Sequence, residues 1–481
     1  MSADRPHIHF VGIGGAGLSA LAHIMLARGW RVSGSDREAS PRLEALRAAG
    51  ARVFVGHDAN VLGNADVVVV SSAVPDENPE VVAARQRGIP VYKRNKWLPE
   101  ITRGYDLIAV AGTHGKTTTT AMVALVLVDA GFDPTVVIGG EVPQLGGNAR
   151  AGDGHLFVLE ADEYDYAFIG LEPYIAVVTN VEHDHPDMFP NQEAVQRAFE
   201  QFVAQVRPDG LLVACGDDPG ARALAEKARV SGLRVVTYGF GPENTWQATE
   251  LHPNDMGGFD FVAVHRGEVV GTFQLQVPGE HNVLNATAAI AVALHLGVPA
   301  AGVRATLRRF AGAARRFELV GSVGRIQIFD DYAHHPSEVR ATLRAARQRF
   351  GQRPVWVVFQ PHTFSRLAAL MSGFAVAFAD ADRVLVTDVY AARETNTFGI
   401  SARDLAERIE RPPATHVPTQ EAVLETLVRE LPDDAVVLTL GAGDITALGP
   451  RLCQALEERR CKGTNRSEQR IEEAEEQRLE R

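Results

Sequence analysis

Runs of four or five apolar residues recur along the chain, and helix-like segments separate them. In the N-terminal part the clearest apolar run is 67–70, residues 7–11 predict a buried strand, and helical patterns cover 18–27 and 41–49. Buried strands that alternate with helices are typical of parallel sheets with helices on both faces. The first hundred residues therefore predict a doubly wound α/β domain.

The same alternation continues through two more regions of the chain. Their predicted strands are 107–110, 157–159, 175–178, 211–214, 235–238, 326–329, 355–359, 384–386 and 436–440. The pattern predicts an α/β fold of three domains, each built on a mostly parallel sheet. The expected domains are a Rossmann-like 1–102, a P-loop ATPase-like 103–312 and a Rossmann-like 313–456.

The composition narrows the possible function classes. Of 481 residues, 46% are hydrophobic and 22% charged, as in ordinary globular proteins. A net charge of −12 argues against binding nucleic acid by phosphate neutralisation. The three cysteines lack metal-ligand spacing and no apolar run approaches a membrane span, so we expect a cytoplasmic protein. Residues 457–481 are mostly charged and predict a disordered or solvated helical tail.

A glycine-rich turn follows the apolar run 107–110. Residues 111–120 read Ala-Gly-Thr-His-Gly-Lys-Thr-Thr-Thr-Thr, and a helix-like segment comes next. Such a turn holds a nucleoside triphosphate, because backbone N–H groups and the lysine face the phosphates. The alternative is a chance turn, since Val110 stands where the general motif has glycine. The residues expected to bind ATP here are Gly112, Thr113, His114, Gly115, Lys116, Thr117 and Thr118.

A second glycine-rich turn follows the first predicted strand. Residues 12–17 read Gly-Ile-Gly-Gly-Ala-Gly, and Asp36 ends the next strand about twenty residues later. This dinucleotide fingerprint alone indicates an NAD-dependent dehydrogenase, but any diphosphate ester fits such a helix N-terminus. Two phosphate-binding turns in one chain indicate two phosphorylated substrates. The residues expected at this second site are Gly14, Gly15, Ala16, Gly17, Ser35, Asp36, Ser71 and Ser72.

Acidic and histidine side chains follow two strands of the middle region. Glu160 ends one strand, where the Mg²⁺ partner of a P-loop usually lies, and Thr117 offers a hydroxyl ligand. The alternative for Glu160 is a solvated acidic cluster, because three more acids follow within five residues. His185 ends a stretch that can ligate a metal or a phosphoryl oxygen, or can form an ordinary polar loop.

Several long strings resemble the Mur ligase family of ATP-dependent amide-forming enzymes, over residues 7–455. The turn at 112–117 is similar to the shortened P-loop of that family, which accounts for the missing first glycine. The other strings that carry the resemblance are 12–17, 278–286, 330–336 and 388–394. They resemble the branch that joins L-alanine to UDP-N-acetylmuramate in peptidoglycan precursor synthesis, a process linked to cell shape and division.

The resemblance implies a role for each domain. The first would bind the UDP-sugar, the second ATP with Mg²⁺ (or Mn²⁺), and the third the amino acid while closing the site. His185 would contact a second metal, and His281, Asn282 and Asn285 would meet the adenine. From the third domain, Tyr332 would meet alanine, and the remaining expected site residues are Asp331, His334, His335, His362 and Arg366.

Three departures from the family pattern leave some positions open. No lysine lies between Lys116 and Lys227, so the carbamylated lysine of several sister ligases is not possible here. Thr363 replaces a basic residue that is common in the family, and the string that begins at Arg94 lacks the usual acid. Contacts at Thr363 and Arg94 stay open, as does the choice between monomer and homodimer.

Other functions remain as alternatives at this point. A recycling ligase that adds an intact tripeptide to the same UDP-sugar differs at the opening glycine string and usually has phenylalanine at the position of Tyr332. An NAD-dependent dehydrogenase would leave Lys116 unexplained. A non-enzymatic ATP-binding regulator would not need the histidines near Asp331.

Overall fold

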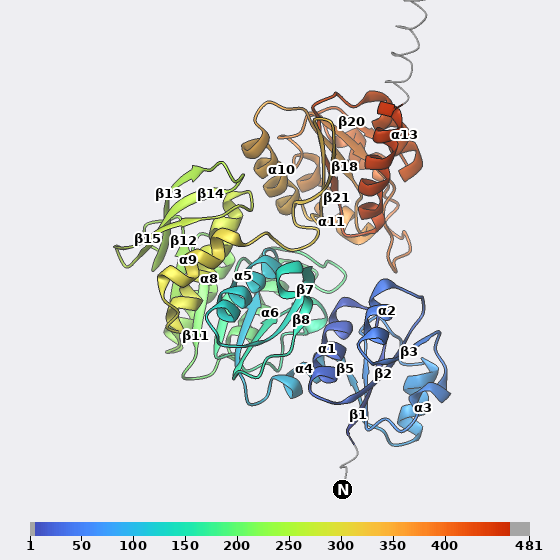
Figure 1. Ribbon diagram of the computed structural model, residues 1–481, viewed down its shortest axis with the longest axis vertical. Helices are drawn as coiled ribbons and strands as arrows, with labels where there is room; N and C mark the ends of the chain where they lie inside the picture. The colour runs from blue at the N-terminus through green and yellow to red at the C-terminus, as the bar shows by residue number, and fades with distance from the viewer. Residues whose placement is uncertain (1–4, 462–481) are drawn as a thin grey trace, which may run out of the picture. The chain divides into compact units, whose positions relative to one another are not determined.

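The structure is a computed structural model of the chain, and it describes residues 5–461. The chain divides into two compact units, Met1–Ala314 and Arg315–Arg481. The first unit contains two sheets and the second contains one, all covered by helices (Figure 1). Three sheet-based domains with mostly parallel strands confirm the predicted fold class. Among the described residues no helix is long and apolar enough to cross a membrane.

The N-terminal sheet has five parallel strands in the order β3-β2-β1-β4-β5. Strand β4 consists of four valines that are all buried, because helices cover both faces of the sheet. The elements are β1 (His7–Val11), α1 (Ala16–Ala27), β2 (Arg31–Asp36), α2 (Pro41–Ala48), β3 (Arg52–Val55), η1 (Ala59–Leu62), β4 (Val67–Val70), α3 (Pro79–Gln86), β5 (Val91–Lys93) and α4 (Arg94–Thr102).

The second sheet has ten strands in the order β15-β14-β13-β12-β11-β10-β6-β9-β7-β8. Strands β13 to β15 form an antiparallel extension, and β8 pairs antiparallel with β7. The strands are β6 (Asp106–Ala111), β7 (Thr135–Val142), β8 (Gly147–Arg150), β9 (Leu156–Glu160), β10 (Ile175–Val178), β11 (Leu211–Cys215), β12 (Arg234–Gly239), β13 (Trp246–Pro253), β14 (Phe259–His265) and β15 (Glu268–Gln274). The helices are α5 (Lys116–Asp129), η2 (Pro143–Leu145), η3 (Tyr164–Tyr166), α6 (Gln192–Val203), α7 (Pro219–Val230), α8 (Glu280–His295) and α9 (Ala300–Arg309).

The third sheet has six strands in the order β16-β17-β21-β18-β19-β20, and only β16 is antiparallel to its neighbour. Its elements are β16 (Glu318–Val323), β17 (Ile326–Asp331), α10 (Pro336–Phe350), β18 (Val355–Phe359), α11 (Phe364–Ala375), β19 (Arg383–Val386), α12 (Ala402–Arg408), β20 (Ala414–His416), α13 (Gln420–Glu430), β21 (Val436–Leu440) and η4 (Asp444–Ala447). A last helix covers 448–461, so the beginning of the predicted tail is helical. The rest of that tail lies outside the described residues.

Candidate active site

The P-loop turn connects β6 to α5. Gly112 and Gly115 have φ angles of 142° and 78°, in the region that favours glycine. A side chain at Gly112 would also collide with Thr179, at the end of β10. Helix α5 starts directly after Gly115, and its first turn buries Thr117 and Thr118. The backbone of this turn therefore has the tight strand-to-helix course that a phosphate site requires.

Lys116 points back across its own turn. Its Nζ donates to the carbonyl oxygen of Gly112 at 2.6 Å and to both carboxylate oxygens of Glu163, at 3.0 and 2.7 Å. The lysine side chain is 13% exposed and that of Glu163 is 3% exposed. Burial disfavours the ammonium charge, but the carboxylates of Glu163, Asp162 and Glu160 outweigh it and raise the pKa of Lys116. Lys116 is therefore a fixed positive charge in the turn.

Thr117 and Glu160 lie together beside this lysine. The hydroxyl of Thr117 donates to Glu160 Oε1 at 3.0 Å, and the backbone N–H of Gly139 donates to Oε2 at 2.6 Å. A hydroxyl and a carboxylate are hard oxygen donors of the kind that Mg²⁺ prefers. The pair fits a magnesium site at the carboxyl end of β9.

The loop after β10 supports the P-loop turn. Asn180 Oδ1 accepts from the backbone N–H of His114 at 2.8 Å, and the hydroxyl of Thr179 donates to the His114 carbonyl at 2.6 Å. Further along this loop, His185 Nε2 lies 3.8 Å from Glu163 Oε1. The expected metal residue His185 is thus next to the lysine-carboxylate pair.

The start of α8 packs against the start of α5. Asn285 Oδ1 accepts from the hydroxyl of Thr119 at 3.1 Å, and Asn285 Nδ2 donates to Asn282 Oδ1 at 3.1 Å. A Cβ at Gly115 would lie 2.7 Å from Asn285 Oδ1. Both asparagines are buried, whereas His281 is exposed in the first turn of α8. Of the three expected adenine-side residues, Asn285 therefore touches the P-loop region directly, and Asn282 holds Asn285 through a hydrogen bond.

The first glycine-rich turn is held by the end of β2. The backbone N–H groups of Gly12 and Ile13 both donate to the carbonyl of Ser35, at 2.8 and 3.0 Å. The N–H of Gly14 donates to Asp36 Oδ2 at 2.8 Å, so this acid supports the turn itself. Helix α1 follows at Ala16 with no side-chain cap, which leaves its N-terminal N–H groups open to an anion.

The arginine that sequence reasoning left open lies at this helix start. A Cβ on Gly17 would collide with the guanidinium of Arg94, from the start of α4. The same guanidinium is 3.5 Å from Asp162 in the loop after β9. Of the two serines expected after β4, Ser71 lies against Gly12, and Ser72 is exposed.

In the second unit, Asp331 ends β17 and is bound to backbone groups. Its Oδ1 accepts from the N–H of Ala333 and its Oδ2 from the N–H of Phe317, both at 2.8 Å. Burial raises the pKa of Asp331 to about 6, although Arg316 and the two N–H groups oppose that rise. Asp331 therefore fixes the turn that carries the expected substrate residues.

Tyr332 and His334 follow in that turn. The guanidinium groups of Arg315 and Arg316 each lie 5.0 Å from the centre of the Tyr332 ring. His334 Nδ1 lies 2.9 Å from the Tyr332 carbonyl oxygen. The next residue, His335, is buried, and its Nδ1 accepts from the Ser337 N–H at 3.2 Å to cap α10. His335 thus helps to start a helix.

A second group of expected residues follows β18. Arg366 Nη1 donates to the His362 carbonyl at 2.8 Å, and the His362 ring centre is 6.1 Å from that of His334. The hydroxyl of Thr363 donates to Glu394 at 2.7 Å. The strand ends of β17 and β18 therefore bring together His334, His362 and Arg366, and Thr363 serves the local structure through Glu394.

Three family models match consecutive parts of the chain. They are described as Mur ligase family, catalytic domain (residues 7–106), Mur ligase middle domain (110–293) and Mur ligase, glutamate ligase domain (315–443). A UDP-N-acetylmuramate–L-alanine ligase of Frankia casuarinae is 52% identical, over 94% of this chain and 97% of its own. A protein of the same name from Paenarthrobacter aurescens is 47% identical, over 93% and 97%.

The chain belongs to the Mur ligase family. Among solved structures, a UDP-N-acetylmuramate–alanine ligase of Thermotoga maritima matches with a TM-score of 0.79 at 32% identity, over 94% of this chain and 99% of its own. A murein peptide ligase of Psychrobacter arcticus matches with a TM-score of 0.69 at 25% identity, over 94% and 98%. This Mur ligase is accordingly an enzyme of cell-wall precursor synthesis, and the predicted family is confirmed.

Sequence reasoning did not assign three residues of this Mur ligase that touch either an expected site residue or Thr363, whose contacts it left open. Glu163 binds Lys116, Arg94 covers Gly17, and Glu394 holds Thr363. The signal for Glu163 was present, since it belongs to the acidic stretch after β9. Which acid of that stretch would meet the lysine depends on the course of the loop, and only the fold decides it.

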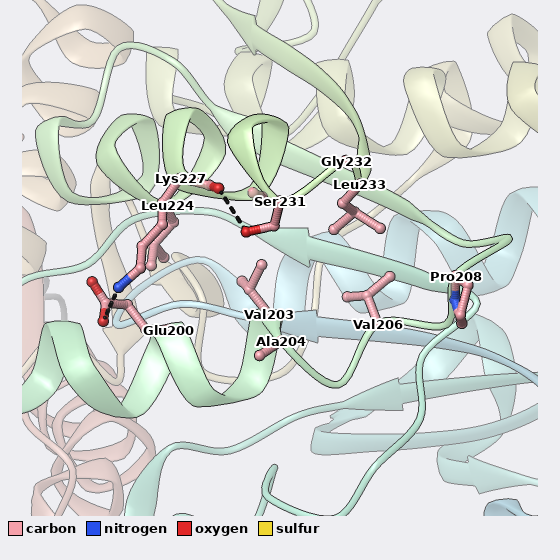
Figure 2. Close-up of a pocket in the computed structure, with 11 residues that line it drawn as sticks. Glu200, Val203, Ala204, Val206, Pro208, Leu224, Lys227, Ser231, Gly232 and Leu233 are labelled. Atoms are coloured by element: carbon pink, nitrogen blue, oxygen red, sulfur yellow. Dashed lines mark hydrogen bonds and ion pairs between the residues drawn. The ribbon is translucent and has the colours of Figure 1, made fainter.

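A separate cavity of about 390 Å³ lies between α6 and α7 (Figure 2). Its apolar lining includes Val203, Val206 and Leu224, and the ion pair Lys227–Glu200 lies at one end. The cavity is next to the residues that precede β11 and β12, whereas the P-loop turn follows the end of the parallel strand β6. It therefore lies at the opposite edge of the sheet from the expected nucleotide site.

Asp331→Asn is expected to change how the stability of this Mur ligase depends on pH. Because the pKa of Asp331 is about 6 in the fold and 3.8 is its ordinary value, the folded state binds the extra proton between these pH values. The contribution of Asp331 to the free energy of unfolding therefore falls as pH rises through this window, by about 3 kcal/mol in total. Asparagine does not titrate, so thermal unfolding from pH 4 to 7 should show the variant gaining stability relative to the wild type as pH rises.

Asp433→Asn is the matched control for that prediction, because the carboxylate of Asp433 is fully exposed. Its stability relative to the wild type should stay level over the same pH range. A level difference for Asp331→Asn as well would contradict the raised pKa.

Proposed function

We propose that this Mur ligase joins L-alanine to the lactyl carboxylate of UDP-N-acetylmuramate, with ATP as the second phosphorylated substrate. The observation that carries the proposal is the presence of two glycine-rich strand-to-helix turns in one compact unit, after β1 and after β6. Each turn opens a helix N-terminus to a phosphate group. The names of the relatives support L-alanine as the amino acid.

ATP makes the carboxylate reactive. A carboxylate is a poor acylating agent, so its oxygen first attacks the γ-phosphorus of ATP and ADP leaves. The neutral amine of L-alanine then attacks the carbonyl of the acyl phosphate, and phosphate leaves from the tetrahedral intermediate as the amide forms. The proposal assigns Lys116 to the charge on the transferring phosphoryl group, where a fixed cation in a closed site stabilises the transition state.

Thr117 and Glu160 would hold Mg²⁺, with His185 as the residue near a second metal. When bound, the metal supplies positive charge next to the phosphoryl oxygens. Asn285 contacts the start of α5 and Asn282 accepts a hydrogen bond from Asn285; both are assigned to the adenine side with His281. In the second unit the proposal assigns Tyr332 to alanine and the group His334, His362 and Arg366 to the reacting groups. Asp331 and His335 hold that turn in place.

Glu160→Gln should reduce the affinity for Mg²⁺ in the presence of ATP. The amide keeps one oxygen acceptor for Thr117 or Gly139 but loses the negative charge that a hard cation requires. We expect the affinity for Mg²⁺ to fall by at least about 10- to 100-fold, which is the loss that removing a supporting group of a metal site causes. The check is the Mg²⁺ concentration for half-maximal phosphate release, with the exposed Glu172→Gln as control. An unchanged Mg²⁺ requirement would remove Glu160 from the metal site.

Phosphate release from ATP tests the proposed reaction directly. With UDP-N-acetylmuramate, release should depend on L-alanine, and glycine and L-serine should replace it less well. The rival is a ligase that adds a tripeptide, as the name of a Neisseria meningitides neighbour, UDP-N-acetylmuramate:L-alanyl-γ-D-glutamyl-meso-diaminopimelate ligase, indicates for that protein. Release that required L-alanyl-γ-D-glutamyl-meso-diaminopimelate would favour the rival, and oxidation of NADH by the protein would favour a dehydrogenase. The proposal places the reaction in the cytoplasm and leaves monomer and homodimer open.

A further inference from the structure

A chain of polar side chains crosses the buried α3 face of the N-terminal sheet. On β1, Ile8 and Phe10 belong to the main apolar cluster, whereas Val11 packs with Val81 of α3 on the other face. Alternation along the strand puts His9 on the same face as Val11. His9 and Glu80 are both fully buried there. Apolar side chains would be the ordinary occupants of these two positions.

Glu80 is the centre of this chain. Its Oε2 is 2.6 Å from His9 Nε2, and its Oε1 is 2.7 Å from both Ser35 Oγ and His57 Nδ1. On the far side, Ser33 Oγ lies 2.7 Å from His9 Nδ1 and 2.8 Å from His7 Nε2. We call Glu80, His9, Ser35 and His57 the Glu80 network.

The hydrogen bonds fix which atoms carry protons. Burial alone would raise the pKa of Glu80, but the bonds from His9, Ser35 and His57 outweigh it and hold this pKa below its usual value. A carboxylate can only accept, so all three partners donate to it. A neutral imidazole that donates through Nδ1 presents Nε2 as an acceptor. His57 therefore has one defined tautomer.

The network ends at the edge of the sheet where ligands bind. His57 follows β3, and the N–H of Gly56 donates to the Asp36 carbonyl at 2.7 Å. The carbonyl of Ser35 accepts from the glycine-rich turn at Gly12, while its hydroxyl binds Glu80. The His57 side chain is 22% exposed, and in the described part of the chain its Nε2 has no hydrogen-bond partner. In open α/β sheets this carboxyl edge is the place of the ligand.

We propose that Glu80 is a positioning residue of the UDP-sugar site, which holds His57 in the tautomer whose Nε2 accepts a hydrogen bond from the nucleoside part of the substrate. The inference rests on the proposed function, because it takes a uridine nucleotide as the ligand. The donor on the nucleoside is either the imide N–H of the base or a ribose hydroxyl. Both offer the same chemistry, a neutral donor to an imidazole nitrogen.

A purely structural role explains the network less well. A buried carboxylate costs desolvation, and replacing buried polar groups by well-packed apolar side chains is often neutral or stabilising. An apolar residue at position 80 would pack against the cluster that contains Val11 and Val81. Such an apolar residue could not hold the Nδ1 proton of His57 and the hydroxyl of Ser35 in place at the same time.

The test measures binding of UDP to the full chain by calorimetry at pH 8. His57→Ala should weaken binding roughly 3- to 10-fold, the range expected for one neutral hydrogen bond. Glu80→Gln should weaken it similarly, because the amide has one acceptor oxygen in place of two and cannot accept from both imidazoles. In the double variant the two losses should not multiply, since Glu80 acts through His57. Losses that multiply, or no loss for Glu80→Gln, would overturn the proposal.

Val81→Ala is the matched control, because Val81 is fully buried on the same helix but has no part in the network. It should lower the melting temperature and leave the Kd of UDP unchanged. If Glu80→Gln does not fold, ¹⁵N-histidine spectra of the wild type decide instead, with the signal missing in His57→Ala identifying His57. A proton on Nδ1 is expected, and a proton on Nε2 alone would overturn the proposal.

Analogues of UDP identify the donor. 3-Methyl-UDP lacks the imide N–H, and deoxy analogues lack one ribose hydroxyl. The analogue without the donor should bind the wild type more weakly than UDP does, but should bind His57→Ala as well as UDP does. If all analogues kept the wild-type preference in His57→Ala, His57 would not be the acceptor. Failure of the wild type to bind UDP at all would instead contradict the proposed function.

Discussion

Replacing Lys116 by alanine is expected to abolish ligation. The ammonium is held inside the P-loop turn by the Gly112 carbonyl and by Glu163, with its charge secured by a raised pKa. In the proposed reaction this charge stabilises the phosphoryl group in transit. Removing such a group from a closed site costs on the order of 3 kcal/mol or more, which corresponds to at least about 100-fold in kcat/KM.

The same substitution has a second consequence for the fold. Without the ammonium, the buried carboxylate of Glu163 has lost its cation, and leaving a buried charge unpaired is costly. The loss of stability should therefore be relieved in Lys116→Ala/Glu163→Gln, which has no charge at either position. Ligation should stay absent in this double variant, and this separates the catalytic effect from the structural one.

Phosphate release and thermal unfolding are the two measurements for this prediction. The control is Lys227→Ala, because Lys227 is 64% exposed and pairs with Glu200 on the surface. That control should keep ligation and melting temperature close to the wild type. Near-normal ligation by Lys116→Ala would show that the turn after β6 does not bind the reacting phosphate.

The parallel strands could be predicted because burial on both faces leaves a clear pattern. The segments Val67–Val70, Ile175–Val178 and Val355–Phe359 are continuous apolar runs, Val436–Leu440 is apolar except for Thr439, and the structure has strands with these bounds. The antiparallel extension β13 to β15 was not predicted. Its strands have one face partly exposed, so polar residues interrupt the apolar run, as in Phe259–His265. The two-residue turn at Arg266 and Gly267 was the signal that could have indicated a hairpin.

The glycine-rich turns could be predicted because few residue types other than glycine can adopt the backbone conformation that such a turn requires. Gly112 and Gly115 have positive φ, and that requirement is visible in the sequence itself. The side chains that meet these turns from elsewhere in the chain could not be predicted in the same way. Arg94 reaches Gly17 across 77 positions and Glu80 reaches His9 across 71, so only the packed sheet brings them together.

Gly17→Val is expected to weaken binding of the UDP-sugar strongly while leaving ATP binding intact. A Cβ at this position would collide with the Arg94 guanidinium, and a branched side chain would cover the open start of α1. Hydrogen bonds to a charged phosphate contribute about 1.5–3 kcal/mol each, so losing two of them weakens binding on the order of 100-fold or more. The P-loop belongs to the ten-stranded sheet, so its geometry should not change.

Calorimetry of the full chain with UDP-N-acetylmuramate and, separately, with ATP measures both effects. Gly302→Ala is the control, because a Cβ there meets nothing closer than 3.9 Å and the position is inside α9. The control should bind both ligands as the wild type does. Arg94→Ala in the Gly17→Val background separates the two causes. Recovery of binding would assign the loss to the collision with Arg94, and continued loss to the covered N–H groups of α1. Tight UDP-sugar binding by Gly17→Val itself would mean that the turn after β1 is not the diphosphate site.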